Sequence, residues 1–279
     1  MVRFKFMGTA AAEAIPALWC ECPLCVQTRI NKDKNVRRRA SYLIDDDTII
    51  DYGPDINWQM NAFDIDPVKV KQVLITHMHN DHLDPVEFYW RRPGFSHVGR
   101  PLDLYGSNVI KEAFMDVARI TSSDYTLESM NIRFHELVTY QETSAHNLKI
   151  VPMKALHAPG KNAQFFVLIR NGKTILVAND TGFPTDDVWE QLVKFRYDLV
   201  SMDCCAGANH PGWPDCHMGA PTNIAFRKRL LEAGCLKEGC HVIATHFSHN
   251  GASSHRELEE ALVPEGIEVA YDGMDVVLE

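Results

Sequence analysis

The sequence predicts an α/β sandwich in which two sheets bring several loops to one edge. Two observations favour this fold class. Segments with the pattern of buried strands alternate with segments of helical pattern along the chain. The strand-like segments also end, one after another, in residues that can bind metal: the stretch 77–82, His157, Asp180 and His246. We therefore expect these strand ends to meet at a shared site.

The composition fits one domain spanning residues 1–279, because the chain shows no linker, repeat or low-complexity tract. Lysine and arginine number 28 against 37 aspartates and glutamates, a formal charge of −9, so no general basic surface for nucleic acid is evident. Residues 7–19 are apolar, but they contain Glu13 and Pro16 and follow an alternating strand at residues 2–6. We interpret them as folded protein rather than a signal peptide, and no run is long enough for a membrane helix. We expect a cytoplasmic protein without a membrane partner.

A C-x-C-x-x-C cluster, formed by Cys20, Cys22 and Cys25, follows the first strand. Without a secretory signal, the eight unevenly spaced cysteines are interpreted as thiols or metal ligands rather than disulfides. Three thiolates at close range suit a tetrahedral zinc and leave one position for a fourth ligand. Three buried free cysteines are the alternative, although Glu21 and Pro23 indicate a loop here.

The basic run Arg37-Arg38-Arg39 precedes two short strands at residues 41–44 and 48–50. We interpret these arginines as a solvated face, with phosphate contact as the lesser alternative. Asp51 follows the second strand and precedes a helix at residues 55–63. A carboxylate at this strand end can orient a metal ligand from outside the coordination shell, or it can cap the turn.

The strongest local signal is the motif His77, His79, Asp81 and His82, directly after a buried strand at residues 70–75. Neutral imidazole and carboxylate are the usual ligands of zinc and similar divalent ions, and a strand end holds such a loop stiffly. A solvated polar loop would not explain why three of the thirteen histidines fall in one turn. The motif therefore predicts a metal site.

Regular elements continue through the middle of the chain, with helices at residues 85–90 and 109–120 and strands at residues 102–105 and 132–137. Three histidines of this region have no partner in sequence and are expected to be ordinary surface or core residues: His97, His135 and His146.

Three further strands are predicted at residues 149–156, 164–169 and 173–178. Asn171-Gly172 predicts a two-residue hairpin between the last two. His157 follows the first of the three strands and Asp180 follows the last. A purely structural role for His157 stays open, because the Ala-Pro-Gly after it is only loosely diagnostic.

The C-terminal part predicts a helix at residues 185–195, a strand at 198–202, a loop at 203–219, a helix from Pro221 and a strand at 241–244. The loop contains His210 and His217, and the last strand leads to His246 and His249. Ser254 with Glu257 three residues later predicts a capping box. The remaining cysteines are expected to be small buried residues, with thiol chemistry as the alternative: Cys204, Cys205, Cys216, Cys235 and Cys240.

With these residues in place, the chain resembles the metallo-β-lactamase superfamily, whose H-x-H-x-D-H signature matches residues 77–82. The resemblance implies an αβ/βα sandwich of two mixed sheets flanked by helices. It also implies a binuclear site in which Asp180 bridges one metal held by His77, His79 and His157 and a second held by Asp81, His82 and His246. The ligand types suit zinc, manganese or iron. Two such ions about 3.5 to 4 Å apart can activate a shared water and clamp both oxygens of an in-line displacement at phosphorus.

A narrower resemblance is to the cyclic-phosphate phosphodiesterases of the carbon-phosphorus lyase pathway, which open 5-phosphoribosyl 1,2-cyclic phosphate. It is carried by the three N-terminal cysteines, by Gly8-Thr9, by the basic stretch before Ala40-Ser41 and by residues 245–249. The resemblance implies that His249 completes a structural zinc with Cys20, Cys22 and Cys25. It further implies a homodimer and a small-molecule phosphodiester as the substrate.

His217 and the ligand Asp81 are the candidate catalytic residues. His217 precedes a helix whose N-terminal amides favour anions, so it can contact phosphoryl oxygens or protonate the leaving alkoxide. His210 is the competing choice. Two other functions remain open: a nuclease resembling the tRNA 3′-end-processing enzymes, and a non-hydrolytic protein resembling the pyrroloquinoline-quinone pathway member. The acidic charge argues against the nuclease, and the complete ligand set argues against the non-hydrolytic protein.

Overall fold

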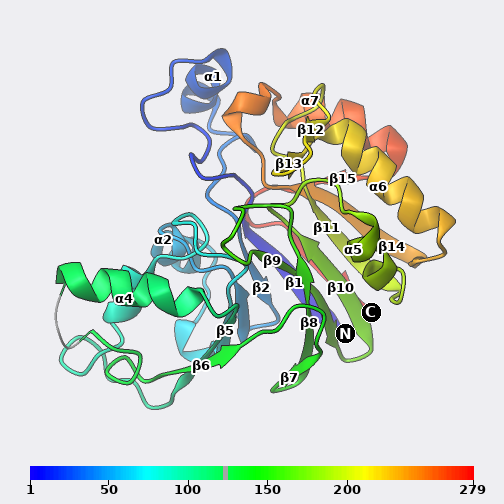
Figure 1. Cartoon of the computed structure of the whole chain (residues 1–279). Coiled ribbons are helices and arrows are strands. Elements are labelled where there is room, and N and C mark those ends of the chain that lie inside the picture. Colours follow the sequence, from blue (N-terminus) through cyan, green and yellow to red (C-terminus); the bar gives the residue numbers. More distant parts are fainter. Residues whose placement is uncertain (122–124) are drawn as a thin grey trace.

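The computed structural model describes residues 1–121 and 125–279. In this part of the chain, two seven-stranded sheets pack face to face, with helices on their outer faces (Figure 1). The predicted α/β sandwich of two mixed sheets flanked by helices is confirmed, since each sheet has parallel and antiparallel neighbours. None of the described helices combines the length and the apolar character needed to span a bilayer.

The first sheet has the order β16-β1-β2-β3-β4-β5-β6. Its strands are β1 (Val2–Gly8), β2 (Ser41–Ile44), β3 (Thr48–Ile50), β4 (Gln72–Leu74), β5 (Leu102–Gly106), β6 (Ile132–Glu136) and β16 (Asp275–Leu278). Strands β3 and β4 are parallel, with Ile50 opposite Leu74. The chain therefore leaves both strands at the same edge, and Asp51 lies beside the start of the metal-motif loop.

The second sheet has the order β15-β14-β11-β10-β9-β8-β7. Its strands are β7 (Thr143–Ala145), β8 (Leu148–Lys154), β9 (Gln164–Arg170), β10 (Lys173–Ala178), β11 (Tyr197–Asp203), β14 (Leu236–Thr245) and β15 (Glu268–Val269). Strands β10, β11 and β14 are parallel, with Ala178 opposite Met202 and Met202 opposite Ala244. Their C-terminal ends consequently lie side by side and carry Asp180, Asp203 and His246.

The predicted hairpin at Asn171-Gly172 is confirmed. It joins β9 and β10, whose Arg170 and Lys173 face each other across the turn. Asn171 and Gly172 both have positive φ, 49° and 77°. A two-residue turn of the kind that matches the twist of the strands needs positive φ at both positions, which asparagine and glycine tolerate best.

Helices cover both outer faces of the sandwich. The first sheet carries α2 (Ile56–Ala62), α3 (Pro85–Tyr89) and α4 (Ile110–Thr121), and the second carries α5 (Asp186–Leu192), α6 (Ala220–Glu232) and α7 (His255–Leu262). The inward faces of the two sheets share an apolar core that includes Phe4, Tyr42, Phe166 and Ile243. The predicted capping box is confirmed at α7, where Ser254 and Glu257 bond reciprocally.

The prediction of a solvated face for the arginine run is wrong for Arg37, which is only 2 % exposed. Its guanidinium donates hydrogen bonds to Thr9 Oγ1 at 2.7 Å and to the Ala270 carbonyl at 2.6 Å. It also meets His255 Nδ1 at 2.9 Å and lies over the ring of Phe247. Through these contacts, the buried Arg37 links the loop after β1 to the segments that follow β14 and β15.

The region of the cysteine cluster also differs from the expectation of a loop. Its loop ends at Cys22, which caps the N-terminus of α1 (Pro23–Asn31), and Pro23 occupies the first turn as proline often does. Helix α1 projects from the body of the molecule in Figure 1. Five short strands were not predicted: β7, β15 and β16, and the pair β12 (Gly212–Trp213) and β13 (His217–Met218).

Candidate metal centre

The first candidate metal-binding group consists of His77, His79 and His157. Their ligand nitrogens lie within 4.8 Å of one another, and His157 Nε2 is 3.1 Å from His79 Nδ1. His77 and His79 follow β4 of the first sheet, whereas His157 follows β8 of the second. The structure thus brings together, from both sheets, the three residues expected to hold one metal.

The second group centres on Oδ2 of Asp180. His82 Nε2 lies 2.8 Å from this oxygen and His246 Nε2 lies 3.1 Å from it. Asp81 Oδ2 is 3.0 Å from His82 Nε2. The other oxygen of Asp180, Oδ1, lies 3.8 Å from His157 Nε2. Asp180 therefore lies between the two groups, where a bridging ligand is expected.

Asp51 orients one of these ligands. It is fully buried, and its Oδ2 accepts a hydrogen bond from His82 Nδ1 at 2.7 Å. The backbone N–H and the hydroxyl of Thr76 both donate to Asp51 Oδ1 at 2.9 Å, so the carboxylate is itself fixed. With Nδ1 engaged, Nε2 of His82 faces Asp180 and Asp81. In metal sites, such a hydrogen bond from the other ring nitrogen to a carboxylate orients a histidine ligand.

Gly53 allows the loop after β3 to contact the metal-motif loop closely. A Cβ atom at this position would lie 2.0 Å from the carbonyl oxygen of Asp81. Such a distance is impossible without movement of the backbone. Glycine at this position therefore lets Asp51 and the motif approach each other.

Five buried atoms of the two groups make no hydrogen bond of good geometry with a described residue: His77 Nε2, His82 Nε2, Asp180 Oδ2 and both ring nitrogens of His246. Buried polar atoms in folded proteins nearly always have partners. Imidazole nitrogens and a carboxylate oxygen that converge in this way are the donor set of a divalent cation. The residues present therefore fit a pair of metal ions.

The crowding of the ligands shifts their pKa values in the ion-free protein. Burial disfavours a charge on His82, but the carboxylates of Asp180, Asp81 and Asp51 outweigh burial and hold its pKa well above the usual value. For His77 burial dominates, and the pKa lies well below the usual value. A proton on His82 occupies the place of a metal, so metal binding must release it.

His217 lies beside the second group. It is on β13 (His217–Met218), which pairs with β12 (Gly212–Trp213) in a short ribbon that the sequence did not predict. Its Nδ1 donates to Asp203 Oδ2 at 2.7 Å, and the same oxygen is 3.3 Å from His246 Nδ1. Burial opposes protonation of His217, but the Asp203 carboxylate outweighs it and raises the pKa of His217.

The structure distinguishes between the two candidate histidines of this loop, His217 and His210. His217 lines the same pocket of about 350 Å³ as His79, Asp81, His157, Asp180 and His246. His210 does not line it, and its Nδ1 accepts a hydrogen bond from the backbone of Gly212. His217 is therefore placed to meet a ligand bound at the candidate metal centre.

Sequence reasoning missed four residues that line this pocket and one that holds His217 there: Glu13, Trp213, Ser248 and Asn250, and Asp203. A signal did exist for Asp203, which ends β11 in the way that Asp180 follows β10. Nothing in the sequence distinguished the others from ordinary loop residues.

The cysteines were only partly predicted. Cys204, Cys205 and Cys235 are buried as expected, but Cys216 and Cys240 are only half buried. Cys216 Sγ lies 3.4 Å from His157 Nδ1, on the side of the ring away from Asp180. The expectation of a small buried residue is therefore wrong for Cys216, which contacts a candidate ligand instead.

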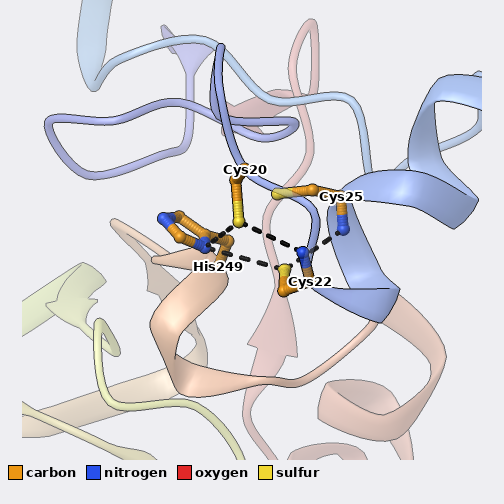
Figure 2. Close-up of side chains that lie close together, drawn as sticks. All are labelled: Cys20, Cys22, Cys25 and His249. Carbon is orange, nitrogen blue, oxygen red and sulfur yellow. Dashed lines mark hydrogen bonds between the residues drawn. The ribbon is translucent and has the colours of Figure 1, made fainter.

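A separate cluster contains Cys20, Cys22, Cys25 and His249, as the resemblance implied. Figure 2 shows the four side chains turned towards one another. His249 Nδ1 lies 3.4 Å from Cys20 Sγ and 3.7 Å from Cys22 Sγ. Burial opposes ionisation of Cys22, but the Cys25 amide and His249 outweigh it and lower its pKa to about 6. Three thiols and one imidazole are the donor set of a structural zinc.

Comparisons with known proteins agree with this fold. Among solved structures, a diphosphatase from the PhnP family superposes with a TM-score of 0.75 at 19 % identity, over 99 % of this chain and 96 % of that one. The Zn(2+)-bound PqqB from Methylobacterium extorquens gives 0.72 at 14 % identity, over 99 % and 100 %. The metallo-beta-lactamase fold protein YhfI from Bacillus subtilis gives 0.67 at 18 %, over 99 % and 98 %. The expected metallo-β-lactamase fold is thereby confirmed.

Two sequence comparisons add to the structural ones. A ribonuclease Z from Methanothermobacter thermautotrophicus is 27 % identical over 137 residues, which are 49 % of this chain and only 38 % of the length of that relative. The family model described as anti-Pycsar protein Apyc1 matches residues 41–216, which is more than half of the chain and includes most of the candidate ligands. The protein belongs to the family of the anti-Pycsar protein Apyc1.

Proposed function

We propose that this protein is a metal-dependent phosphodiesterase that hydrolyses a small cyclic phosphodiester. The observation that carries the proposal is the convergence of seven metal-binding side chains from two sheets beside a histidine held by a buried carboxylate. The substrate suggested by the sequence resemblance, 5-phosphoribosyl 1,2-cyclic phosphate, is one member of this class. A pocket of about 350 Å³ is at the small end of the range for ligand sites, which favours a small molecule.

The residues divide into two sets of ligands. His77, His79 and His157 would hold one divalent metal, Asp81, His82 and His246 would hold the other, and Asp180 would bridge them. Zinc, manganese and iron all suit these ligands. When bound, the pair supplies an activated water and neutralises charge on the phosphoryl group. Cys20, Cys22, Cys25 and His249 would hold a structural zinc.

His217 is the proposed general acid. Its Nδ1–H donates a hydrogen bond to Asp203, which fixes the ring and leaves Nε2 to face a ligand in the pocket. Because Asp203 raises the pKa of His217, the imidazolium form persists to a higher pH than for a free histidine. A proton can then pass from Nε2 to the departing alkoxide oxygen, so that ring opening does not leave a free alkoxide.

Two other functions keep some support. The match to a ribonuclease Z favours a nuclease, but the net charge of −9 argues against a surface for RNA. The similarity in fold to PqqB favours a non-hydrolytic role, but the ligand set for two metals has no gap. Cleavage of a tRNA precursor without turnover of cyclic phosphodiesters would favour the nuclease instead.

The proposal is tested by metal analysis of the purified protein combined with a screen of cyclic phosphodiesters, bis-aryl phosphates and lactones. We expect about three metals per chain, one of them resistant to chelation and lost in Cys22→Ser, together with hydrolysis of a cyclic phosphodiester. One metal in total would contradict the binuclear site. The variant His217→Ala should lower kcat about 100-fold, whereas the exposed His97→Ala should not.

A further inference from the structure

Glu13 forms part of the wall of the candidate pocket, although nothing in the function proposed above uses it. It lies in the loop between β1 and α1 and lines the pocket together with Asp81 and His217. Its Oε1 accepts hydrogen bonds from Ser248 Oγ and Asn250 Nδ2, each at 2.8 Å. Among the described residues, the two hydrogen bonds and the ion pair of this carboxylate all use Oε1. Oε2 is therefore left to meet a ligand.

The position of Glu13 is fixed by the cysteine cluster. Ser248 and Asn250 flank His249, whose Nδ1 faces the thiols (Figure 2). The opposite nitrogen of that ring, Nε2, lies 3.6 Å from Glu13 Oε1. The backbone N–H of Ala11 also donates to the Phe247 carbonyl at 2.9 Å, which joins the two loops. The Glu13 carboxylate thus lies on the side of the His249 ring away from the thiols, and the residues on either side of His249 hold it at the pocket.

The charges around the pocket are unusual for a site that binds phosphates. None of the described residues that line it is lysine or arginine, and its carboxylates come from Glu13, Asp81 and Asp180. Asp81 and Asp180 belong to the ligand set that would hold the metals, where the reacting phosphodiester would bind. Glu13 belongs to neither group of ligands, so no metal in either group would offset the negative charge of its carboxylate. A second anionic group on the substrate would meet this charge without a cation to offset it.

We infer that Glu13 is a specificity-determining residue, whose carboxylate disfavours phosphodiesters with a second anionic group and favours those that present a hydroxyl or amino donor. The inference rests on the proposed phosphodiesterase function of the same pocket. It narrows that function, because a substrate with a terminal phosphate such as 5-phosphoribosyl 1,2-cyclic phosphate is then disfavoured relative to its form without that phosphate.

The test uses two matched substrate pairs: adenosine 2′,3′-cyclic phosphate with and without a 5′-phosphate, and ribose 1,2-cyclic phosphate with and without a 5-phosphate. The metal-loaded protein should have the higher kcat/KM on the member without the extra phosphate. Glu13→Gln keeps the shape and the oxygen acceptor but removes the charge. It should change the ratio of kcat/KM within a pair by about tenfold in favour of the phosphorylated member.

Three controls accompany this measurement. Glu238→Gln removes the same charge at an exposed position outside the pocket and should leave the ratio unchanged. Glu13→Asp keeps the charge and should keep the preference. Metal content should be the same in Glu13→Gln and in the unaltered protein, because the amide oxygen can still accept from Ser248 and Asn250.

A measurement on the unaltered protein does not depend on any variant. Because the preference arises from charge, it should shrink as the salt concentration rises from about 0.05 M to about 0.5 M, where screening is stronger. Turnover with a ratio that neither Glu13→Gln nor salt changes would overturn this inference alone. Absence of turnover on every cyclic phosphodiester would overturn the proposed function and the inference with it.

Discussion

The carboxylate of Asp203 contacts two histidines of the candidate site and holds their rings in place. Its Oδ2 accepts from His217 and lies close to His246, while its Oδ1 accepts from the backbone of Cys205 and Met218. Four groups therefore converge on one fully buried carboxylate. Replacing it changes the orientation of the proposed acid without removing the acid itself.

We predict that Asp203→Asn lowers kcat about 100-fold, because an amide cannot hold both imidazoles as the carboxylate does. Steady-state kinetics on the substrate found in the screen measure the effect, with metal content as a second measurement. Asp215→Asn, an exposed acid on the same ribbon, provides the matched control. A variant Asp203→Asn with unaltered kcat and metal content would show that the carboxylate has no such role.

Arg37 and His255 make the stability of the fold depend on pH. Burial and the neighbouring guanidinium of Arg37 lower the pKa of His255 to about 4. An unfolded chain protonates histidine near pH 6.5, so it binds more protons than the folded protein between these two values. Stability should therefore fall as the pH falls from about 6.5 towards 4, and it should not fall further through this residue below that range.

Urea unfolding at pH 7.5 and pH 5 tests this pH dependence. His255→Gln removes the titrating group, so the variant should lose about 2 kcal/mol less of its free energy of unfolding between the two pH values than the unaltered protein does. Loss of bound metal on acidification affects both proteins alike and cancels in the comparison. Equal losses in the two proteins would contradict the assignment to His255.

At the scale of elements, the loops after β3 and β4 must pack closely for the metal motif to take its shape. Gly53→Ala places a Cβ atom against the Asp81 carbonyl. We predict that this substitution lowers the free energy of unfolding by about 2 kcal/mol and reduces the metal content, since Asp81 moves away from His82. Gly99→Ala is the matched control, because a Cβ atom there meets open space. Unaltered metal content and stability in Gly53→Ala would refute this account of the loop packing.

Elements with strong local patterns were predictable from the sequence. Strands β2, β3 and β10 begin and end where the short runs of buried residues and the turn residues beside them indicate. The metal motif was recognised because its ligands are adjacent in sequence. Strand β16 was missed for the opposite reason, since its pairing of Val2 with Leu278 joins the two ends of the chain and leaves only a four-residue pattern.

Residues whose role depends on tertiary contacts could not be predicted. The three successive arginines are indistinguishable in sequence, yet only Arg37 has Thr9, Ala270 and His255 within hydrogen-bonding distance. Likewise, Asp51, Asp180 and His246 have positive φ values of 62°, 47° and 58°. These left-handed conformations at strand ends are uncommon for residues other than glycine, and the surrounding structure holds them in place.

At the scale of the whole molecule, the candidate metal centre joins the two sheets. Asp51, His77 and His82 come from the first sheet, and Asp180 and His246 come from the second. Without ions, these loops face each other through His82 and Asp180, whose Nε2 and Oδ2 atoms lie 2.8 Å apart, and through buried atoms that make no hydrogen bond of good geometry. The packing of the two sheets against each other should therefore be less stable when the site carries no metal.

We predict that removing the metals lowers the melting temperature by about 10 °C. Binding at about a thousand times the dissociation constant stabilises the folded state by about 4 kcal/mol, and each kcal/mol shifts the melting temperature of a chain of this size by a few degrees. The measurement is best made in Cys22→Ser, which we expect to lack the metal of the cysteine cluster, so that the shift on chelation reports the centre between the sheets. Adding His82→Ala to this background should remove most of the shift. A melting temperature that does not respond to chelation in Cys22→Ser would mean that no ion links the two sheets, and the convergence of Asp180 with His82 and His246 would need another explanation.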